Sequence, residues 1–552
     1  MQCTRRPSIE RPNYKGDAVE IKKTAAVIAA GALTLGLAAC GDSGSSDATG
    51  ADSGSTGGDN YVLVNGSEPQ NPLVPGDTNE VGGGRIVDNI YAGLKYYDAE
   101  GNAHNEMAES IELEGEKTFK VVLKDDVKWS DGTPVKAEDF VNAWNLTMKE
   151  ALLSASFYEP IMGFEEGKES MEGLKVIDDK TFTIELDQPE ADFPEQLGYS
   201  AFFPLHPSAM DDLKAYGENP ITNGPYKLAE WNHNQDATIV PNEEYTGDRK
   251  PQNDGVTFVF YAQQSAAYAD LLAGNLDVLD AIPDSAFSTY EDELGDRAIN
   301  QPAAVFQSFT IPENLEHFSG EEGNLRRQAL SKAINRQEIT GTIFQGTRTP
   351  ATDFTSPVIP GHSDNLNGAE VLDYDPEEAK RLWDAADEIA PFQGEFTIGY
   401  NADGGHQPWV DAVTNSIRNT LGIDAVGNAY PDFKSLRDDV TKRNIKGAFR
   451  TGWQGDFPLL SNFLVPLYTT NASSNDGDYS NAEFDALLKR AAGASDAEEA
   501  TPLYNEAQEI LLRELPVIPL WYSNVTGGSS ENVDNVVFSW KSQPVYYEIT
   551  KK

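Results

Sequence analysis

The stretch that decides the fold is Lys128-Trp129-Ser130-Asp131-Gly132-Thr133-Pro134-Val135-Lys136-Ala137-Glu138-Asp139-Phe140. It predicts a short strand, a Ser-Asp-Gly turn and a helix, because glycine permits a tight turn and aspartate favours a helix N-terminus. The helix is expected over 137–150, and it should bury Phe140, Val141 and Trp144. We therefore expect the stretch to be architectural and not to carry chemistry.

On both sides of this stretch, short β-rich runs alternate with amphipathic helical runs. Strands bounded by Gly, Pro, Asp or Asn are predicted at 61–64, 118–123, 181–186, 256–261 and 396–400. Helices are predicted at 137–150, 325–335, 376–386, 408–421 and 497–515. The pattern is mixed α/β. A chain of 552 residues exceeds the ~250–300 residues over which one core usually extends, so two or three lobes are expected.

The composition excludes several classes of protein. The chain has 89 acidic and 42 basic side chains, and this balance argues against a nucleic-acid partner, because phosphate binding requires clustered Lys and Arg. Two cysteines cannot form a disulfide framework or a four-cysteine zinc site. The six histidines show no metal-ligand spacing. We expect neither a metal nor a cofactor.

The N-terminal region is typical of an exported protein. An apolar run at 25–39 follows Lys22 and Lys23, and it is shorter than the ~20 residues that cross a bilayer, so 1–39 is predicted to be a signal peptide. Leu37-Ala38-Ala39-Cys40 resembles a bacterial lipobox, which implies that Cys40 is lipidated. Residues 41–60 form a Gly/Ser/Asp-rich tether. The alternatives are a retained membrane anchor and a plain signal peptide with an unmodified cysteine.

The fold-deciding stretch closely resembles the signature of the extracellular solute-binding proteins of family 5, the oligopeptide-binding receptors of ATP-binding cassette importers. Further matches stand in family order: Asn71-Pro72-Leu73, Ile90-Tyr91-Ala92-Gly93-Leu94, Thr222-Asn223-Gly224-Pro225-Tyr226-Lys227-Leu228, Leu325-Arg326-Arg327-Gln328-Ala329-Leu330 with Ala333-Ile334-Asn335-Arg336, Gly452-Trp453-Gln454-Gly455-Asp456-Phe457-Pro458, and Tyr479-Ser480-Asn481-Ala482-Glu483-Phe484-Asp485. Matches spread over nearly the whole mature chain make a coincidence improbable.

The resemblance implies an α/β, two-lobed periplasmic-binding-protein-like fold (type II, cluster C) with an extra subdomain inserted in lobe I. Lobe I would comprise 61–301 and 520–552, with the inserted subdomain at about 85–201. Lobe II would comprise 302–519. The crossovers near 305–311 and 515–521 would form the hinge, since closure of two lobes needs few chain crossings.

The resemblance also implies a function. The protein would capture oligopeptides outside the cell and deliver them to the membrane permease of an ATP-binding cassette importer. It would be anchored to the outer face of the cell membrane by the lipidated Cys40, act as a monomer and have no enzymatic activity. Two other hypotheses are a receptor of the same fold for an oligosaccharide or another solute, and a secreted lipid-anchored hydrolase.

Three residues of the Gly-Trp-x-x-Asp region match family positions that contact the peptide. Asp456 would anchor the α-ammonium group, because a desolvated carboxylate attracts an ammonium more strongly than an exposed one does. Trp453 would line the first side-chain pocket, and Arg450 would meet the peptide carboxylate with its planar guanidinium. The structural alternatives are a helix cap or a loop salt bridge for Asp456, a core position for Trp453 and an internal ion pair for Arg450.

Other candidates come from loops. Asn401 and His406 match family positions that contact the peptide backbone and its far end, and Phe433 falls near a family aromatic wall, where the chain differs in length by one residue. Asn79, Val81 and Gly82, with the next two glycines, are expected in an exposed loop whose backbone pairs with an extended peptide. The alternatives are an exposed loop histidine and a plain flexible turn.

Overall fold

The computed structural model describes residues 60–402, 405–431, 433–472, 474–494 and 496–552. The predicted signal peptide, Cys40 and the tether up to residue 59 lie outside the described residues.

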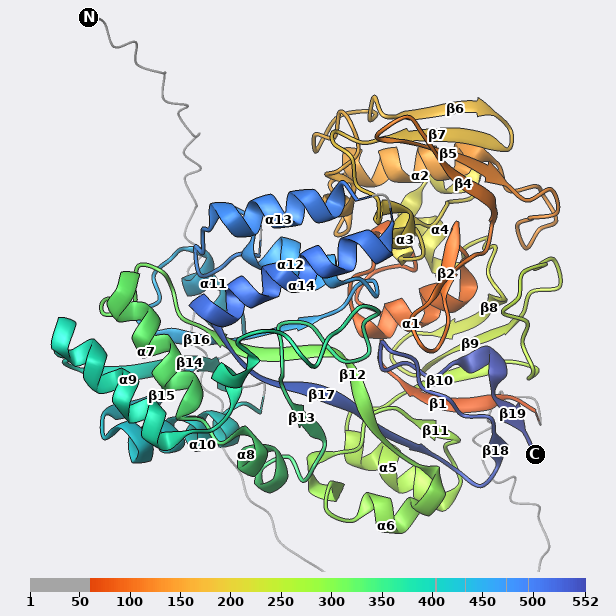
Figure 1. The fold of residues 1–552 in the computed structure, drawn as a ribbon. Coiled ribbons are helices and arrows are strands. Elements are labelled where there is room, and N and C mark those ends of the chain that lie inside the picture. The colour runs from red at the N-terminus through yellow and green to blue at the C-terminus, as the bar shows by residue number, and fades with distance from the viewer. Residues whose placement is uncertain (1–59, 403–404, 432, 473, 495) are drawn as a thin grey trace, which may run out of the picture. The chain divides into compact units, whose positions relative to one another are not determined.

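Most strands belong to one mixed sheet. Its members are β1 (Val62–Gly66), β8 (Tyr226–Asn232), β9 (Asp236–Pro241), β10 (Val256–Phe260), β11 (Val278–Leu279), β12 (Ala298–Thr310), β13 (Arg348–Pro350), β14 (Glu395–Asn401), β15 (Asp424–Tyr430), β16 (Ala448–Gln454) and β17 (Val517–Ser529). The strand order is β15-β14-β16-β12-β17-β11-β1-β10-β9-β8, with β13 paired to β17 (Figure 1). The long strands β12 and β17, of 13 residues each, pair antiparallel from Ala298 opposite Gly528 to Thr310 opposite Val517.

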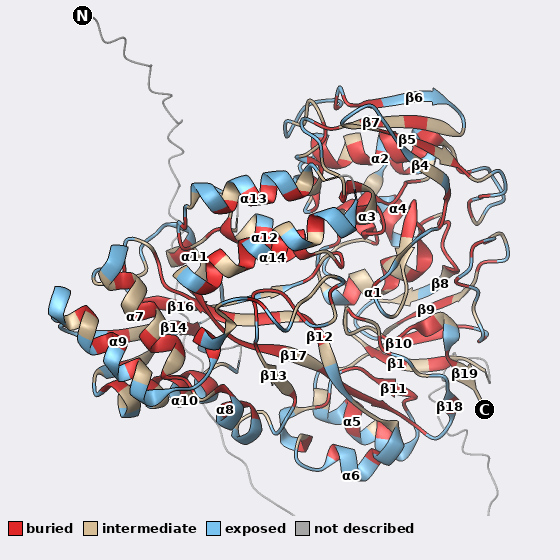
Figure 2. Cartoon of the chain, viewed as in Figure 1, coloured by how far each residue is buried: buried red, intermediate tan, exposed pale blue. Residues whose placement is uncertain are grey.

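Two large apolar cores lie along this pair of strands. The first core draws mainly on residues 62–278 and 525–549, and the second mainly on 304–522. Figure 2 shows helices whose buried side faces the sheet and whose other side is exposed. The helices are α1 (Val81–Ile90), α2 (Ala137–Lys149), α3 (Phe193–Gln196), α4 (Leu213–Glu218), α5 (Gln264–Ala273), α6 (Tyr290–Leu294), α7 (Gly320–Lys332), α8 (Arg336–Thr342), α9 (Pro376–Ile389), α10 (Gln407–Leu421), α11 (Phe433–Thr441), α12 (Leu460–Tyr468), α13 (Ala482–Ala492) and α14 (Ala497–Glu514).

A separate antiparallel sheet packs with α2 inside the stretch 108–185. Its order is β4-β5-β7-β6, with the bounds β4 (Ala108–Glu114), β5 (Thr118–Leu123), β6 (Leu174–Asp178) and β7 (Thr181–Glu185). Phe140 and Trp144 of α2 are fully buried and contact the ring of Phe182 from β7. Two further sheets have two strands each. One pairs β2 (Lys95–Tyr97) with β3 (Ala103–Asn105), and the other pairs β18 (Val533–Asp534) with β19 (Thr550–Lys551).

The fold-deciding stretch forms the predicted turn and helix. Gly132 has φ +87°, a conformation that favours glycine. Asp139 closes the start of α2, because its carboxylate accepts the Lys136 N–H at 2.9 Å and the Trp129 Nε1–H at 3.0 Å. The predicted strand is wrong, since only an isolated bridge joins Lys128 to Pro134.

The other predicted elements are observed, β5 with the predicted bounds and the rest with at least one shifted end. The prediction for 325–335 differs most, because α7 begins at Gly320 and ends at Lys332. Its first turn holds Glu321 and Glu322, whose charge suits the positive end of a helix, and this signal precedes the apolar pattern that defined the prediction.

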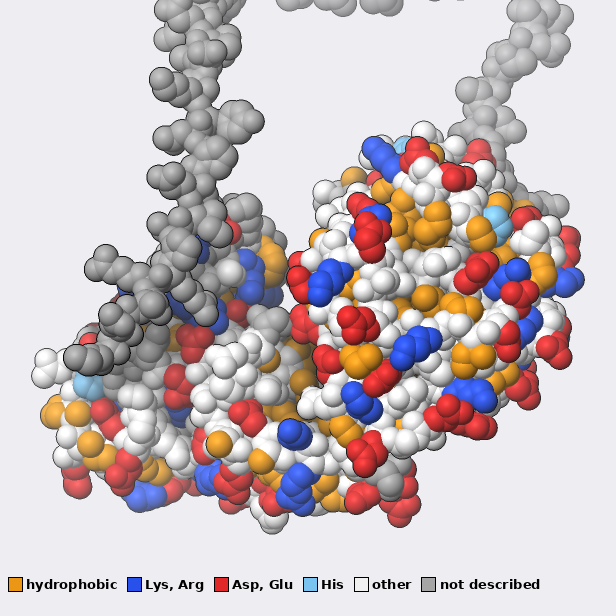
Figure 3. Space-filling model, turned by 90° about the horizontal axis from the view of Figure 1, so that it is seen from above, with side chains coloured by type: hydrophobic (Ala, Val, Ile, Leu, Met, Phe, Trp, Pro, Cys, Tyr) orange, Lys and Arg blue, Asp and Glu red, His pale blue; other side chains and the backbone are white. Residues whose placement is uncertain are grey.

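Acidic side chains are interspersed with Lys and Arg over the face seen in Figure 3.

The contacts of Asp139 generate a stability prediction. The substitution Asp139→Ala removes the cap of α2 and leaves the buried Trp129 Nε1–H without its acceptor, so we expect the free energy of unfolding to fall by about 1–3 kcal/mol. Denaturant unfolding measures it. The control is Glu138→Ala, which removes an exposed carboxylate from the same turn. Equal stability of the two variants would contradict the capping role.

Candidate functional site

Some of the predicted ligand-binding residues line cavities, and they are spread over three of them. These residues are Asp456, Trp453, Arg450, Phe433 and His406. We call the three cavities the Asp456 cavity, of about 110 Å³, the Trp453 cavity, of about 240 Å³, and the His406 cavity, of about 540 Å³. The predicted residues therefore do not share a single pocket. Each cavity has a different chemistry, which follows from the side chains around it.

The Asp456 cavity lies where the turn after β16 meets the C-terminal segment. Its walls include Asp456, Tyr199, Trp540 and Lys541. Gly455, directly before Asp456, donates its N–H to the Ala304 carbonyl oxygen of β12 at 2.8 Å, which ties this turn to a central strand. The Lys541 Nζ lies 5.1 Å from the centre of the Tyr199 ring, within the range of a cation–π contact.

Asn462 of α12 holds Asp456 and Trp453 in place. Its Oδ1 accepts the Asp456 N–H at 2.9 Å and the Trp453 Nε1–H at 3.2 Å, and its Nδ2 donates to Asp456 Oδ2 at 3.2 Å. Asp456 is thus fixed by a neutral amide and not by a salt bridge. The alternative reading of Asp456 as a helix cap does not match these contacts, because the Asp456 carboxylate accepts from a side chain and not from a helix N–H.

Burial raises the pKa of the Asp456 carboxyl above its ordinary value. The positive charge of Lys541 and hydrogen bonds from Asn462 and Tyr199 act in the opposite direction, but they do not cancel the cost of desolvation. Burial also raises the pKa of the Tyr199 hydroxyl well above its ordinary value, with the negative charge of Asp456 adding to the effect. A carboxylate in this setting gains from any cation that enters the cavity.

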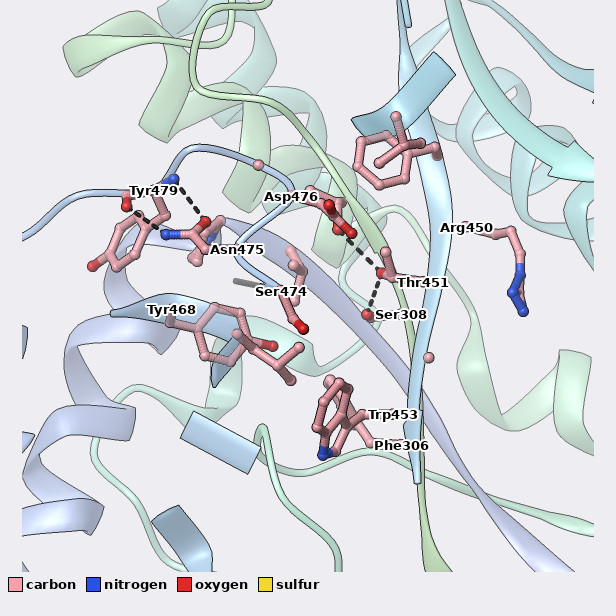
Figure 4. Close-up of a pocket in the computed structure, with 18 of the residues that line it drawn as sticks. Phe306, Ser308, Arg450, Thr451, Trp453, Tyr468, Ser474, Asn475, Asp476 and Tyr479 are labelled. Atoms are coloured by element: carbon pink, nitrogen blue, oxygen red, sulfur yellow. Dashed lines mark hydrogen bonds between the residues drawn. The ribbon is translucent and has the colours of Figure 1, made fainter. Parts of the chain in front are cut away.

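The Trp453 cavity is mainly apolar and lies on one face of β12 and β16. Phe306 pairs with Trp453, and Ser308 pairs with Thr451, so these four residues share a face of the sheet. The Thr451 hydroxyl contacts the Ser308 hydroxyl at 2.8 Å (Figure 4). Further apolar lining comes from Leu436, Leu467, Tyr468 and Val440.

A loop between α12 and α13 closes this cavity. The Asn475 Nδ2 donates to the carbonyl oxygens of Thr469 at 3.0 Å and Tyr479 at 2.8 Å, and the Tyr479 N–H donates to Asn475 Oδ1 at 3.0 Å (Figure 4). Asp476 of the same loop pairs with Arg437 of α11 at 2.5 Å. The loop charges are therefore satisfied internally, and the cavity keeps its apolar character.

Arg450 and Phe433 lie together at the border of the Trp453 cavity. The Arg450 guanidinium carbon is 5.5 Å from the centre of the Phe433 ring, and Phe433 is 49% exposed as the first residue of α11. Figure 4 shows the Arg450 side chain on the opposite side of β16 from Thr451 and Trp453, as the alternation of a strand requires. Arg450 thus points away from the apolar pocket.

The His406 cavity has one basic and one acidic side chain among its walls, Arg348 and Asp284. His406 precedes α10, and its Nδ1 accepts the Trp409 Nε1–H at 3.1 Å. Arg348 of β13 also lines the cavity, with its guanidinium carbon 5.1 Å from the centre of the Phe344 ring. Burial lowers the pKa of Arg348, although Asp284 attracts its charge. A guanidinium on an apolar wall suits a carboxylate ligand.

The remaining predicted residues lie elsewhere. Asn401 is buried at the end of β14 and lines none of the described cavities. The expected exposed loop at Asn79, Val81 and Gly82 is wrong from Val81 onward, because Val81 begins α1. The N–H groups of Gly82 and Gly83 donate to the Glu80 carboxylate at 2.6 Å and 2.7 Å. These amides are occupied by a helix cap and cannot pair with a peptide.

Sequence reasoning missed several residues of these cavities. Asn462 stands six residues after Asp456, and no spacing rule connects an amide on the next helix with a carboxylate in a turn. Lys541 and Arg348 are brought in by the C-terminal segment and by β13, so only the topology reveals them. Among the described residues, no group of three or more His, Cys, Asp or Glu could hold a metal ion, and no helix is long and apolar enough to cross a membrane.

Comparison with known proteins identifies the class. Residues 102–475 match the model described as "Bacterial extracellular solute-binding proteins, family 5 Middle". The chain belongs to this family, and the α/β two-lobed fold predicted from the sequence is confirmed. The fold that contains the two apolar cores is shared with periplasmic peptide-binding proteins of known structure.

Particular relatives show how far the similarity extends. The oligopeptide-binding protein OppA of Bacillus subtilis (strain 168) is 27% identical over 531 residues, which cover 92% of this chain and 95% of the relative. The probable deoxycholate-binding periplasmic protein YgiS of Escherichia coli (strain K12) is 28% identical and covers 83% of this chain and 87% of the relative. The unliganded open form of the periplasmic murein tripeptide-binding protein MppA has a TM-score of 0.77 at 24% identity, covering 90% of this chain and 98% of that one.

The role of Asn462 generates a second prediction. The substitution Asn462→Ala leaves the Trp453 Nε1–H and the Asp456 carboxylate without their amide partner, so we expect a loss of about 1–3 kcal/mol in stability. Denaturant unfolding followed by tryptophan fluorescence measures the effect. Asn275→Ala, at an exposed position, serves as the control. A loss no larger than that of the control would show that Asn462 does not hold these groups.

Proposed function

We propose that the protein is a receptor that captures oligopeptides outside the cell and delivers them to the permease of an ATP-binding cassette importer. The observation that carries this proposal is a poorly compensated carboxylate in one cavity and a guanidinium in another. In the Asp456 cavity the carboxylate is only partly compensated, and in the His406 cavity the half-buried guanidinium of Arg348 lies with Asp284. A peptide with free ends carries the complementary charges, an ammonium at one end and a carboxylate at the other.

The spacing along β12 supports a peptide as the ligand. Gly455 contacts Ala304 beside the Asp456 cavity, and Gln307 lines the His406 cavity. The three residue-to-residue steps from Ala304 to Gln307 span about 10 Å in an extended strand. An extended tripeptide or tetrapeptide covers a comparable distance. The α-ammonium would then lie at Asp456 and the carboxylate near Arg348 and His406.

The Trp453 cavity supplies a place for a side chain of the peptide. Its walls are mainly apolar, with Phe306, Leu436 and Tyr468 among them, and the loop residue Asp476 is paired with Arg437. An apolar side chain gains about 25 cal/mol for each Å² removed from water, so such a residue is favoured here. Arg450 and Phe433 would form the rim of this pocket toward the peptide.

The two cores support the proposed domain limits. Lobe I would comprise 61–301 with 520–552 and lobe II 302–519, with an inserted subdomain at about 85–201. Within the described residues, β12 and β17 are the long strands that run through both regions, and this supports a hinge at 305–311 and 515–521. Closure would desolvate the Asp456 carboxylate further and strengthen its attraction for an ammonium.

Anchoring and delivery are part of the proposal. The lipobox-like sequence before Cys40 supports a lipidated cysteine on the outer face of the cell membrane, with the tether 41–60 leading to the folded part. The receptor would act as a monomer without enzymatic activity and release its peptide to the permease.

A second candidate is a receptor of this fold for a solute that is not a peptide. The similarity to YgiS, a relative with deoxycholate in its name, favours this second candidate, because the alignment with YgiS covers 83% of this chain. The apolar Trp453 cavity would accept a flat apolar solute. Such a ligand has no α-ammonium, and it would therefore bind independently of the charge on Asp456.

The anchoring role of Asp456 gives a direct test. The substitution Asp456→Asn keeps the shape but removes the charge, and we expect the affinity for a tetrapeptide with a free N-terminus to fall by about 100-fold or more, since a desolvated charge pair contributes roughly 2–5 kcal/mol. N-acetylation of the peptide should cause a similar loss in the unsubstituted protein. Calorimetry measures both. Unchanged affinity, with Asp211→Asn as the control at an exposed position, would rule out the proposed anchor.

The raised pKa of Asp456 predicts the pH dependence of binding. The ammonium binds the ionised carboxyl, so affinity should be full above the pKa of Asp456 and should decrease as the pH falls through it. Because burial raises this pKa from 3.8, the decrease begins at a higher pH than an exposed aspartate would give. Calorimetry between pH 7 and pH 4, with the fold checked by circular dichroism, measures it. A flat profile would contradict the role of the carboxylate.

A further inference from the structure

The Asp456 cavity contains more negative charge than one α-ammonium neutralises. Asp88 of α1 and Asp98 line it together with Asp456. Asp98 stands at the rim, where its Oδ2 lies 2.9 Å from His104 Nε2 and its Oδ1 accepts the Asn102 N–H at 2.8 Å. These hydrogen bonds outweigh partial burial and lower the pKa of Asp98. Three carboxylates therefore belong to one small cavity.

Arg249 lines the same cavity, but its charge is already committed. Its Nε and Nη2 donate to the two oxygens of the Glu106 carboxylate at 2.7 Å and 3.0 Å. Its Nη1 donates to the Asp88 carbonyl oxygen at 2.9 Å, and its Nη2 also reaches the Tyr91 carbonyl oxygen at 3.2 Å. The Asp88 contact is with the backbone, so it does not neutralise the Asp88 side chain. The pair of Arg249 with Glu106 adds no net charge.

Lys541 is then the one remaining Lys or Arg among the described lining residues. Its charge lowers the pKa of both Asp88 and Asp456, which places it within electrostatic reach of the two carboxyls, and its ammonium lies over the Tyr199 ring. Three carboxylates and one lysine leave two negative charges, with histidine counted as neutral. The α-ammonium of a peptide supplies only one of the two missing positive charges.

Asp88 is the carboxylate best placed to receive the second charge. Within the described part of the chain, its side chain accepts no hydrogen bond and forms no ion pair, whereas Asp456 is held by Asn462 and Asp98 by Asn102. Burial raises the pKa of Asp88 despite the charges of Lys541 and Arg249. Aromatic residues complete the walls, and they can pack against the methylene stem of a long side chain. They are Tyr96, Tyr97, Trp540, Tyr546 and Tyr547.

We propose that Asp88 is a specificity-determining residue that selects peptides whose first residue carries a cationic side chain. The α-ammonium of the ligand binds Asp456, and the side-chain ammonium or guanidinium of the same residue binds Asp88. This inference rests on the proposed function, because it assigns the side-chain preference of the site that holds the peptide N-terminus. It concerns ligand charge and not ligand length.

The experiment compares two tetrapeptides that differ only at the first residue, lysine in one and norleucine in the other. Norleucine keeps the methylene stem and lacks the ammonium, so the comparison isolates the charge. Calorimetry should show that the protein binds the lysine peptide about 10-fold more tightly or better. The substitution Asp88→Asn should remove this preference by weakening the lysine peptide and leave the norleucine peptide within about 2-fold.

Asp126→Asn is the matched control, because it removes an exposed carboxylate with the same change in net charge. It should leave the lysine preference intact. Equal affinity of the unsubstituted protein for the two peptides overturns the inference. This outcome does not depend on whether a substituted protein folds. Equal weakening of both peptides by Asp88→Asn also overturns it, while binding of both peptides shows that the receptor assignment holds. Failure of every peptide with a free N-terminus to bind contradicts the proposed function itself, and the inference with it.

Discussion

The antiparallel pairing of β12 with β17 is the constraint on which the rest of the structure depends. The two strands are 13 residues long; β17 contributes buried residues to both apolar cores, and β12 contributes to the second core and packs Ile299 against the first. Trp453 is fixed by its place opposite Phe306, and the turn at Gly455 is fixed by the carbonyl of Ala304. The cavities are therefore arranged around one pair of strands, and a movement of one core relative to the other would change them together.

The sequence predicted the parts of the fold that local physics controls. The turn at Gly132, the cap at Asp139 and most helices have the predicted form, because caps, turns and apolar spacing act over a few residues. The glycine run after Glu80 was misread as a loop, since a glutamate cap overcame the low helix propensity of three glycines. The site could be predicted only in part. Asp456 and Trp453 belong to a family motif, whereas Asn462, Lys541, Asp88 and Arg348 are assembled by topology.

Electrostatics explains why so acidic a chain can still recognise a particular ligand. Most of its carboxylates are solvated, and their charges are screened over about 8 Å at physiological salt. Asp456 and Asp88 differ because burial leaves them poorly solvated. In the proposed function, the ligand supplies the positive charge that these two carboxylates lack. Arg249 shows the contrast, because its buried charge is fully paired with Glu106 and is thus structural.

Whether the protein holds peptides by their free N-terminus can be read from the ligand that co-purifies with it. Native mass spectrometry of the purified protein, followed by denaturation and sequencing of the released ligand, identifies what the cavities contain. The account predicts short peptides with free α-amino groups. A bile acid, a saccharide or peptides with blocked N-termini as the dominant ligand would contradict it.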